Sequence, residues 1–228
     1  MFDIKATPLP DYSRREDIVN AITHFLGVPF CVIAMGFLLK LQVSRGANAT
    51  AVASTCLYLI STLIVFACLG IYHILKPSFG KKVARLIDHS DIYLMISGTV
   101  TAFILPYMTE SNRKSSLGII IAIWALSAIG IFLTFVDLKK FNTVQIFMYV
   151  FMGWTAIFGM RSIYRVGDVG KAFVITVLIG GLFITVGAFL YFIGKKKRYF
   201  HAVFHVCVLM GTVVIFIGNY NYGLATLA

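Results

Sequence analysis

Residues 172–194 read AFVITVLIGGLFITVGAFLYFIG and contain no Asp, Glu, Lys or Arg. A helix needs about 20 apolar residues to cross the hydrocarbon core of a bilayer. Lipid offers no partners for backbone polar groups, so a crossing segment must be a helix that satisfies its own hydrogen bonds. This stretch therefore predicts a transmembrane helix.

Six more uncharged runs of similar length occur along the chain, at residues 18–39, 46–75, 92–109, 115–136, 141–160 and 199–228. Only 13% of the 228 residues are charged, against about 25% in a soluble domain. The mean hydropathy is +0.89. A soluble protein with a buried helical core would not repeat such runs. We expect an all-α fold, a seven-transmembrane helix bundle that forms one domain over residues 18–228 after a polar tail at residues 1–17.

The tail has no early apolar core, so we expect no cleavable signal peptide. The cysteines lie inside the uncharged runs, at Cys31, Cys56, Cys68 and Cys207. This placement is typical of buried thiols rather than of a disulfide framework.

Positive charge predicts the orientation of the bundle. Seven crossings divide the 20 Lys and Arg residues into 13 on the side of the N-terminal tail and seven on the other side. Under the positive-inside rule, the N-terminus is cytoplasmic and the C-terminus lies outside. The net charge of +11 reflects this bias and suits anionic lipid headgroups. We expect membrane lipids as partners and no nucleic acid, because no soluble basic domain is present. The short tails indicate a multi-pass protein of a cell membrane, in particular a bacterial inner membrane.

All five histidines fall near the ends of runs that this orientation places on the cytoplasmic side. They are His24, His73, His89, His201 and His205. At about 1.5 Å per residue, these groups lie within roughly 5–10 Å of the inner boundary. The candidate site is therefore built by the first, second, third and seventh spans.

His201 and His205 stand one helical turn apart, so both rings can reach one ion. The alternative is a pair of interfacial histidines that face headgroups. His73 can supply a third nitrogen from another helix at the same depth. Three protein ligands with one open position is the arrangement of catalytic zinc, whose bound water becomes acidic. We therefore expect Zn²⁺ at this site.

Asp88 follows Arg85 at the inner start of the third span. Its carboxylate could act as a general base toward metal-bound water or orient a ligand ring. The alternative is a solvated carboxylate that offsets the neighbouring basic residues. His89 would point about 100° away from Asp88 on a helix, and we expect it to be interfacial.

Three blocks of sequence resemble the haemolysin III family, which is related to the progestin and adipoQ receptors. The first block is EDIVNAITH at residues 16–24. The second is YH at residues 72–73, followed by LIDHSDIYLMISGT at residues 86–99. The third is HAVFHVCVLMG at residues 201–211. The resemblance covers essentially the whole chain in span number and block order.

The resemblance implies a seven-helix bundle with a zinc ion near the cytoplasmic face. It assigns the zinc ligands to His73, His201 and His205 and the functional carboxylate to Asp88. Adiponectin receptors and alkaline ceramidases, which are similar to this group, point to hydrolysis of a lipid amide. His24, Asn20 and Glu16, all in the first block, would then lie behind the metal ligands or contact the substrate.

The chain departs from the family pattern at two positions. Leu69 stands where a serine usually precedes the span 2 histidine by four residues, and Ala102 stands where proline is frequent. The missing serine removes a polar contact near the metal. The absence of this serine weakens the inference of catalytic activity from the family more than it weakens the inference of metal binding.

Three function classes follow from these patterns. The first is a zinc-dependent hydrolase of lipid amides, with its site in the inner leaflet. The second is a non-enzymatic receptor or membrane-homeostasis sensor with structural zinc. The third is a pore-forming cytolysin. Uncharged outer halves of the spans disfavour an ion path, and the lack of large extramembrane segments disfavours a receptor, so the sequence favours the hydrolase.

Overall fold

The computed structural model describes residues 4–107, 112–165, 167–194 and 197–226, and their only regular secondary structure is helical, with no strand among them. The all-α prediction is therefore confirmed for the described part of the chain. The long helices are α1 (Arg14–Phe25), α2 (Gly27–Ser44), α3 (Ala49–Ile74), α4 (Phe79–Ile104), α5 (Arg113–Trp154), α8 (Gly167–Gly194) and α9 (Phe200–Thr226). The short ones are η1 (Ile4–Ala6), η2 (Leu105–Tyr107), α6 (Ala156–Gly159) and α7 (Arg161–Tyr164).

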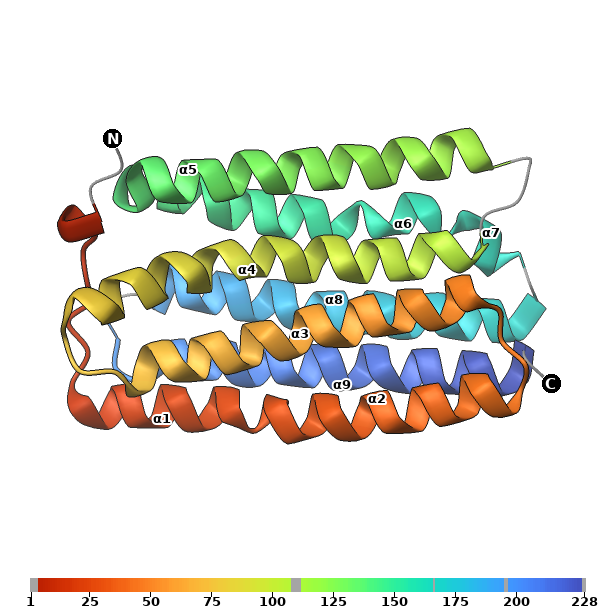
Figure 1. The fold of residues 1–228 in the computed structure, drawn as a ribbon, viewed down its shortest axis with the longest axis horizontal. Helices are drawn as coiled ribbons and strands as arrows, with labels where there is room; N and C mark the ends of the chain where they lie inside the picture. Colours follow the sequence, from red (N-terminus) through yellow and green to blue (C-terminus); the bar gives the residue numbers. More distant parts are fainter. Residues whose placement is uncertain (1–3, 108–111, 166, 195–196, 227–228) are drawn as a thin grey trace.

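The helices run side by side along the long axis of the molecule (Figure 1). α1 leads into α2 through Leu26, and the two helices form one rod. The start of α1, the α3–α4 turn and the α8–α9 turn all lie at one end of the bundle, with η1 of the tail (Figure 1). The α2–α3 turn and the end of α9 lie at the opposite end.

α5 is interrupted at Asp137, whose backbone is extended (φ −164°, ψ 91°). The Asp137 Oδ1 atom accepts a hydrogen bond from the backbone N–H of Lys140 at 2.9 Å, as a capping carboxylate does at the start of a helix. The ribbon reverses direction at this end of α5 (Figure 1). The break falls in the polar gap between the predicted spans at residues 115–136 and 141–160.

Five segments of the described chain are long and apolar enough to cross a membrane. They are Arg14–Ser44, Ala49–Ile74, Arg113–Gly159, Gly167–Gly194 and Phe200–Tyr222. The outward surfaces of these helices carry large apolar side chains, such as Ile121, Phe147 and Phe158, which are exposed. Such a surface would be an aggregation liability in water. These features identify a multi-pass membrane protein.

The junction of α1 and α2 packs closely on α3. A Cβ atom added at Gly27 would overlap the ring of Phe66, which is fully buried. The Phe66 ring in turn lies 6.0 Å from the ring of His24, measured between centroids. The absence of a side chain at Gly27 therefore sets how closely α1 approaches the helix that carries His73.

Candidate metal centre

Four of the five histidines converge at one end of the bundle from three helices. His24 lies in the last turn of α1, His73 in the last turn of α3, and His201 and His205 in the first two turns of α9. The His24 and His205 rings lie 3.6 Å apart between centroids. The His201 and His205 rings lie 4.2 Å apart. The predicted grouping of histidines at one end is thus present in the structure.

Ring nitrogens of His24, His73 and His205 all lie within 4.8 Å of one another, which is close enough to hold one metal ion. His201 joins from the side, since its Nε2 lies 3.2 Å from Nε2 of His73. Two nitrogens on one tetrahedral zinc ion lie about 3.4 Å apart. The group of mutually close nitrogens therefore contains two histidines of the predicted ligand set, His73 and His205, together with His24. The third predicted ligand, His201, lies beside His73.

The hydrogen bond of His205 fixes which of its nitrogens faces the cluster. The hydroxyl of Thr23 donates to backbone carbonyls of its own helix. Its oxygen lies 3.1 Å from Nδ1 of His205, and it can only accept there. Nδ1 of His205 then carries the proton, so Nε2 keeps its lone pair. A lone pair on Nε2 is what a metal ligand requires.

Asp17 orients the His73 ring as Thr23 orients the His205 ring, with Nδ1 bonded and Nε2 toward the cluster. An oxygen of Asp17 lies 3.3 Å from Nδ1 of His73, and the other oxygen lies 2.5 Å from Nζ of Lys81. All three side chains are buried. A carboxylate that accepts from the distal ring nitrogen fixes the tautomer and orientation of a metal-binding histidine. Nε2 of His73 therefore faces the cluster with its lone pair available.

Two tyrosines enclose His201. The Tyr12 ring stacks on the His201 ring with centroids 5.4 Å apart, and the Tyr191 ring lies 5.1 Å away. Tyr12 belongs to the N-terminal tail, and burial raises the pKa of its phenol. The phenol is therefore neutral beside His201. The tail packs over the metal end because Lys82 and Arg85 donate hydrogen bonds to the carbonyls of Lys5 and Pro8.

Several nitrogens of the cluster are buried without a hydrogen-bond partner among the described residues. They are both ring nitrogens of His24, Nδ1 of His201 and Nε2 of His205. Buried polar atoms are nearly always paired, and an orphan atom calls for an ion or a water molecule. Imidazole nitrogens suit zinc, copper, iron and nickel. The donor set therefore fits a transition-metal ion.

Asp88 lies beside the cluster but is bonded elsewhere. Its Oδ2 atom lies 2.9 Å from Nδ1 of His89, so His89 contacts Asp88 instead of pointing away from it. The expectation that His89 points away from Asp88 was wrong, because two neighbouring side chains can bend toward each other despite their 100° separation. The interfacial location of His89 stays a prediction. Asp88 lines the same cavity as His24 and His201. Its role in proton transfer stays a prediction.

Glu16 and Asn20 lie in α1, at the histidine end of the bundle. Glu16 accepts hydrogen bonds from the backbone and hydroxyl of Ser13 and so closes a capping box at the start of α1. Asn20 is buried, and its amide has no partner among the described residues. A small hollow lined by both residues also touches His201. Their contact with a metal or substrate stays a prediction.

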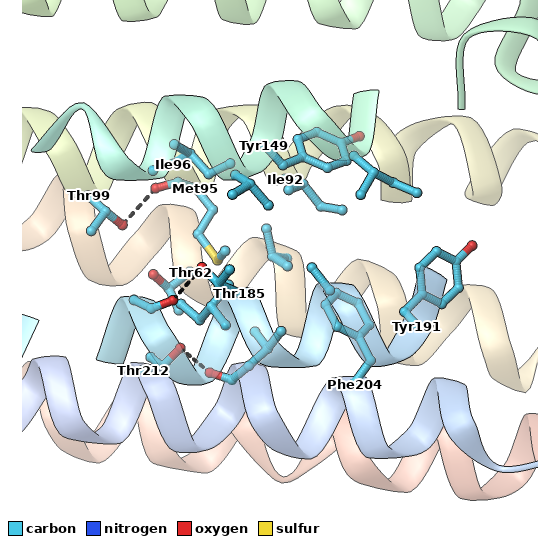
Figure 2. Close-up of a pocket in the computed structure, with 18 of the residues that line it drawn as sticks. Thr62, Ile92, Met95, Ile96, Thr99, Tyr149, Thr185, Tyr191, Phe204 and Thr212 are labelled. Carbon is cyan, nitrogen blue, oxygen red and sulfur yellow. Dashed lines mark hydrogen bonds between the residues drawn. The ribbon is translucent and has the colours of Figure 1, made fainter. Parts of the chain in front are cut away.

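A cavity of about 210 Å³ runs from the histidine end into the bundle. Tyr12, His24, Asp88 and His201 line its first part. Figure 2 shows Tyr149, Tyr191 and Phe204 toward one end of the cavity and threonines toward the other. Apolar side chains from α3, α4 and α9 line the stretch between them, including Val65, Leu69, Ile92, Met95 and Val208.

Sequence reasoning missed several residues of this site, namely Tyr12, Asp17, Lys81, Tyr149 and Tyr191. Asp17 had a usable signal, because it precedes Asn20 by three residues and His24 by seven. That spacing puts all three on one helical face. Tyr149 had a partial signal, because Gln145 lies one helical turn before it in the same uncharged run. Tyr191 had none, since no other polar group lies near it in its run. Both helices nevertheless reach the site, for Tyr149 donates a hydrogen bond to the carbonyl of His89 at 2.6 Å.

The fold and the site together define a multi-pass helical membrane protein with a buried histidine cluster at one end of its bundle. A family model described as haemolysin-III related matches residues 12–216, and the chain belongs to that family. It is 30% identical over 207 residues to the hemolysin-3 homolog of Bacillus subtilis (strain 168), covering 90% of this chain and 93% of the relative. It is also 30% identical over 212 residues to hemolysin-3 of Bacillus cereus, covering 93% and 94%. The family resemblance of the three sequence blocks is confirmed.

Proposed function

We propose that the chain crosses a cell membrane seven times, with its N-terminus in the cytoplasm and its C-terminus outside. The rod of α1 and α2, the helices α3, α4, α8 and α9, and the two halves of α5 supply the crossings. The basic side of the bundle supports this orientation, because the tail with the start of α1, the α3–α4 turn with the start of α4, the break in α5 and the α8–α9 connection carry 13 of the 20 Lys and Arg residues. A bacterial cell membrane fits the two Bacillus relatives.

We infer that the histidine cluster holds zinc through His73, His201 and His205. The orphan nitrogens of the cluster support a bound ion, and the 3.2 Å approach of His201 to His73 supports a shared one. Bound zinc would polarise a carbonyl group and acidify a water molecule. Asp17 orients His73, and Thr23 orients His205. The nitrogens of His24 lie within 4.8 Å of those of His73 and His205, so His24 can contact the ion or the substrate.

The reaction that best suits this arrangement is hydrolysis of a lipid amide. The single observation that carries it is the continuity of the cavity, which joins the histidines and Asp88 to an apolar channel inside the bundle. Such a channel binds a lipid chain and leaves its polar head beside the histidines. Asp88 would take a proton from the attacking water and return it to the leaving amine. Tyr12 covers His201 and limits the access of bulk water from the tail side.

The test is turnover by purified protein in detergent or lipid. Wild type and Asp88→Asn are offered a panel of long-chain amides and esters, and released fatty acid is measured. Loss of hydrolysis in Asp88→Asn by about 10²-fold or more, with metal content unchanged, is expected for a general base. Equal turnover by both proteins would remove Asp88 from the mechanism. Absence of turnover by wild type with zinc bound would reject the hydrolase.

One observation favours a second candidate, a sensor with structural zinc. Structural zinc sites are closed by four protein ligands, whereas catalytic sites keep one position open. His24 lies close enough to His73 and His205 to be the fourth ligand. Leu69 also stands in place of the serine that would put a polar group near the site. Zinc that is retained in wild type without any turnover would favour this candidate.

The name of the Bacillus cereus relative, hemolysin-3, suggests a third candidate, a cytolysin. Leakage of dye from lipid vesicles tests it directly. Release of dye by wild type and not by a variant that lacks the cluster would support a cytolytic role for this chain.

A further inference from the structure

Four threonines meet in the cavity, far from the histidines. Thr62, Thr99, Thr185 and Thr212 come from α3, α4, α8 and α9, and all four line the cavity. Figure 2 shows them around Met95, at the end opposite Tyr149 and Tyr191. We call these four residues the threonine collar.

Three of the four collar threonines lie at one depth below the histidine end. Thr62 precedes His73 by 11 residues, Thr99 follows Asp88 by 11, and Thr212 follows His201 by 11. A rise of 1.5 Å per residue makes this separation about 16 Å on these three helices, whereas Thr185 lies about 9 Å from Tyr191 on α8. The lining between the two levels is apolar. The cavity therefore has a polar entrance, an apolar channel and a second polar level.

The collar offers acceptors rather than donors. Each threonine hydroxyl donates to the carbonyl four residues earlier in its own helix, at 2.7 Å for Thr62 and Thr99, 2.8 Å for Thr185 and 2.9 Å for Thr212. The hydroxyl oxygens keep lone pairs that can only accept. The indole N–H of Trp154 donates to Thr185 at 3.0 Å. Among the described residues, no other donor reaches Thr62, Thr99 or Thr212.

We propose that the threonine collar recognises a hydroxyl group within the apolar chain of the lipid that enters this cavity. An extended chain advances about 1.2 Å per bond, so a group some 16 Å from the head lies roughly 13 bonds along the chain. A hydroxyl near carbon 12 would donate to a collar oxygen in a channel that otherwise offers no polar partner. The ligand class is a mid-chain hydroxylated fatty acyl lipid. This inference rests on the proposed function only in that a lipid chain occupies the cavity.

A hydrogen bond to the collar would make the cavity selective for a chain with a hydroxyl at this depth. A hydrogen bond made away from water contributes about 1 kcal/mol net, or roughly fivefold in affinity. A hydroxyl that enters an apolar channel without a partner loses its hydration and is rejected. A hydroxyl at carbon 7 would lie about 7 Å from the head, in the apolar channel, so it should weaken binding. One at carbon 12 should strengthen it.

Trp154 provides a reporter at the collar. The chain has two tryptophans, and Trp124→Phe leaves Trp154 as the only indole. Fluorescence of this variant is titrated with octadecanoic acid, 7-hydroxyoctadecanoic acid and 12-hydroxyoctadecanoic acid, with the protein free of metal. We expect the 12-hydroxy acid to bind about fivefold tighter than the plain acid and the 7-hydroxy acid to bind more weakly.

A triple variant isolates the collar. Thr62→Val, Thr99→Val and Thr212→Val together keep the side-chain shape and remove three acceptors, so the preference for the 12-hydroxy acid should vanish while the plain acid still binds. Thr134→Val is the matched control, because Thr134 is buried, donates to Gly130 at 2.9 Å and does not line the cavity.

Three outcomes would overturn the proposal. Equal affinity for the plain and 12-hydroxy acids in wild type, or a preference that survives in the triple variant, rejects recognition by the collar and leaves lipid binding intact. Failure of every acid to change Trp154 fluorescence rejects the collar and, with it, a lipid chain in the cavity. This titration measures neither hydrolysis nor metal binding, so it tests the collar independently of those two parts of the proposed function.

Discussion

The ammonium group of Lys81 lies 2.5 Å from a carboxylate oxygen of Asp17, and both side chains are buried. The pair joins the first turn of α4 to the first turn of α1. The second oxygen of Asp17 reaches His73. One carboxylate therefore neutralises a buried cation and orients a candidate metal ligand at the same time.

Replacement of Asp17 should weaken metal binding and stability together. Asp17→Asn leaves Lys81 as a buried charge without a counter-charge, a change that costs about 3–5 kcal/mol. It also weakens the hold on His73, which should raise the zinc Kd by about 10–100-fold. Thermal unfolding of the metal-free protein and competition with a chelator measure the two effects.

The double variant Asp17→Asn with Lys81→Met separates these effects. Removal of the unpaired ammonium should restore much of the stability, while zinc affinity stays low because His73 is still poorly oriented. Recovery of wild-type affinity in the double variant would mean that Asp17 serves only as the counter-charge of Lys81.

Single substitutions should identify which histidines bind the metal. We expect His201→Ala to lower zinc affinity by more than about 100-fold, the upper range for a residue that only orients a ligand, and His24→Ala to lower it by about 10-fold. His89→Ala is the matched control, because its ring contacts Asp88 and not the cluster. Metal content after dialysis against graded chelator gives the order. A larger loss in His24→Ala than in His201→Ala would exchange the two residues in the ligand set.

The sequence predicted the helices from charge-free runs, and this criterion was weakest at α4. The third run begins at residue 92, whereas α4 begins at Phe79. Its first turns carry charged residues that a run-based reading assigns to a loop. Lys81 is nevertheless buried in the helix because Asp17 lies opposite it. A pairing between residues 64 positions apart leaves no mark in a local pattern.

The sequence predicted the depth of the site residues but not how their side chains face one another, because contacts between distant helices leave no local pattern. The position of a histidine within its run gives its depth in the membrane, so the gathering of histidines at one end followed from the sequence. The rotation of each helix about its axis is set by packing. Depth alone therefore could not reveal that the His24 ring would lie 3.6 Å from the His205 ring or that Tyr191 would approach His201.

The N-terminal tail should slow the exchange of metal. Tyr12 stacks on His201, and an aromatic contact of this kind contributes about 0.5–1.5 kcal/mol. Tyr12→Ala should therefore speed extraction of the metal by a chelator by roughly 2–10-fold. Asp11→Ala is the control, since Asp11 is the exposed neighbour of Tyr12. Identical extraction rates in Tyr12→Ala and wild type would mean that the tail does not cover the site.

Two glycines of the same helix give a matched test of how the fold positions the site. A Cβ atom at Gly27 would overlap the ring of Phe66, whereas one at Gly36 would meet nothing within 4 Å. Gly27→Ala should destabilise the protein by about 1–3 kcal/mol, because the buried ring cannot move without strain. Gly36→Ala should be neutral or stabilising by about 0.5–1 kcal/mol, because alanine is the better helix former.

The same pair of variants links packing to chemistry. The Phe66 ring lies against Gly27 and 6.0 Å from the His24 ring, so its displacement should shift His24 relative to His205 and reduce zinc affinity in Gly27→Ala. Gly36→Ala should bind zinc as wild type does. Unfolding temperature and zinc Kd are measured on both variants. A Gly27→Ala protein that is destabilised yet binds zinc with unchanged affinity would show that the α1–α3 approach supports the fold without tuning the metal site.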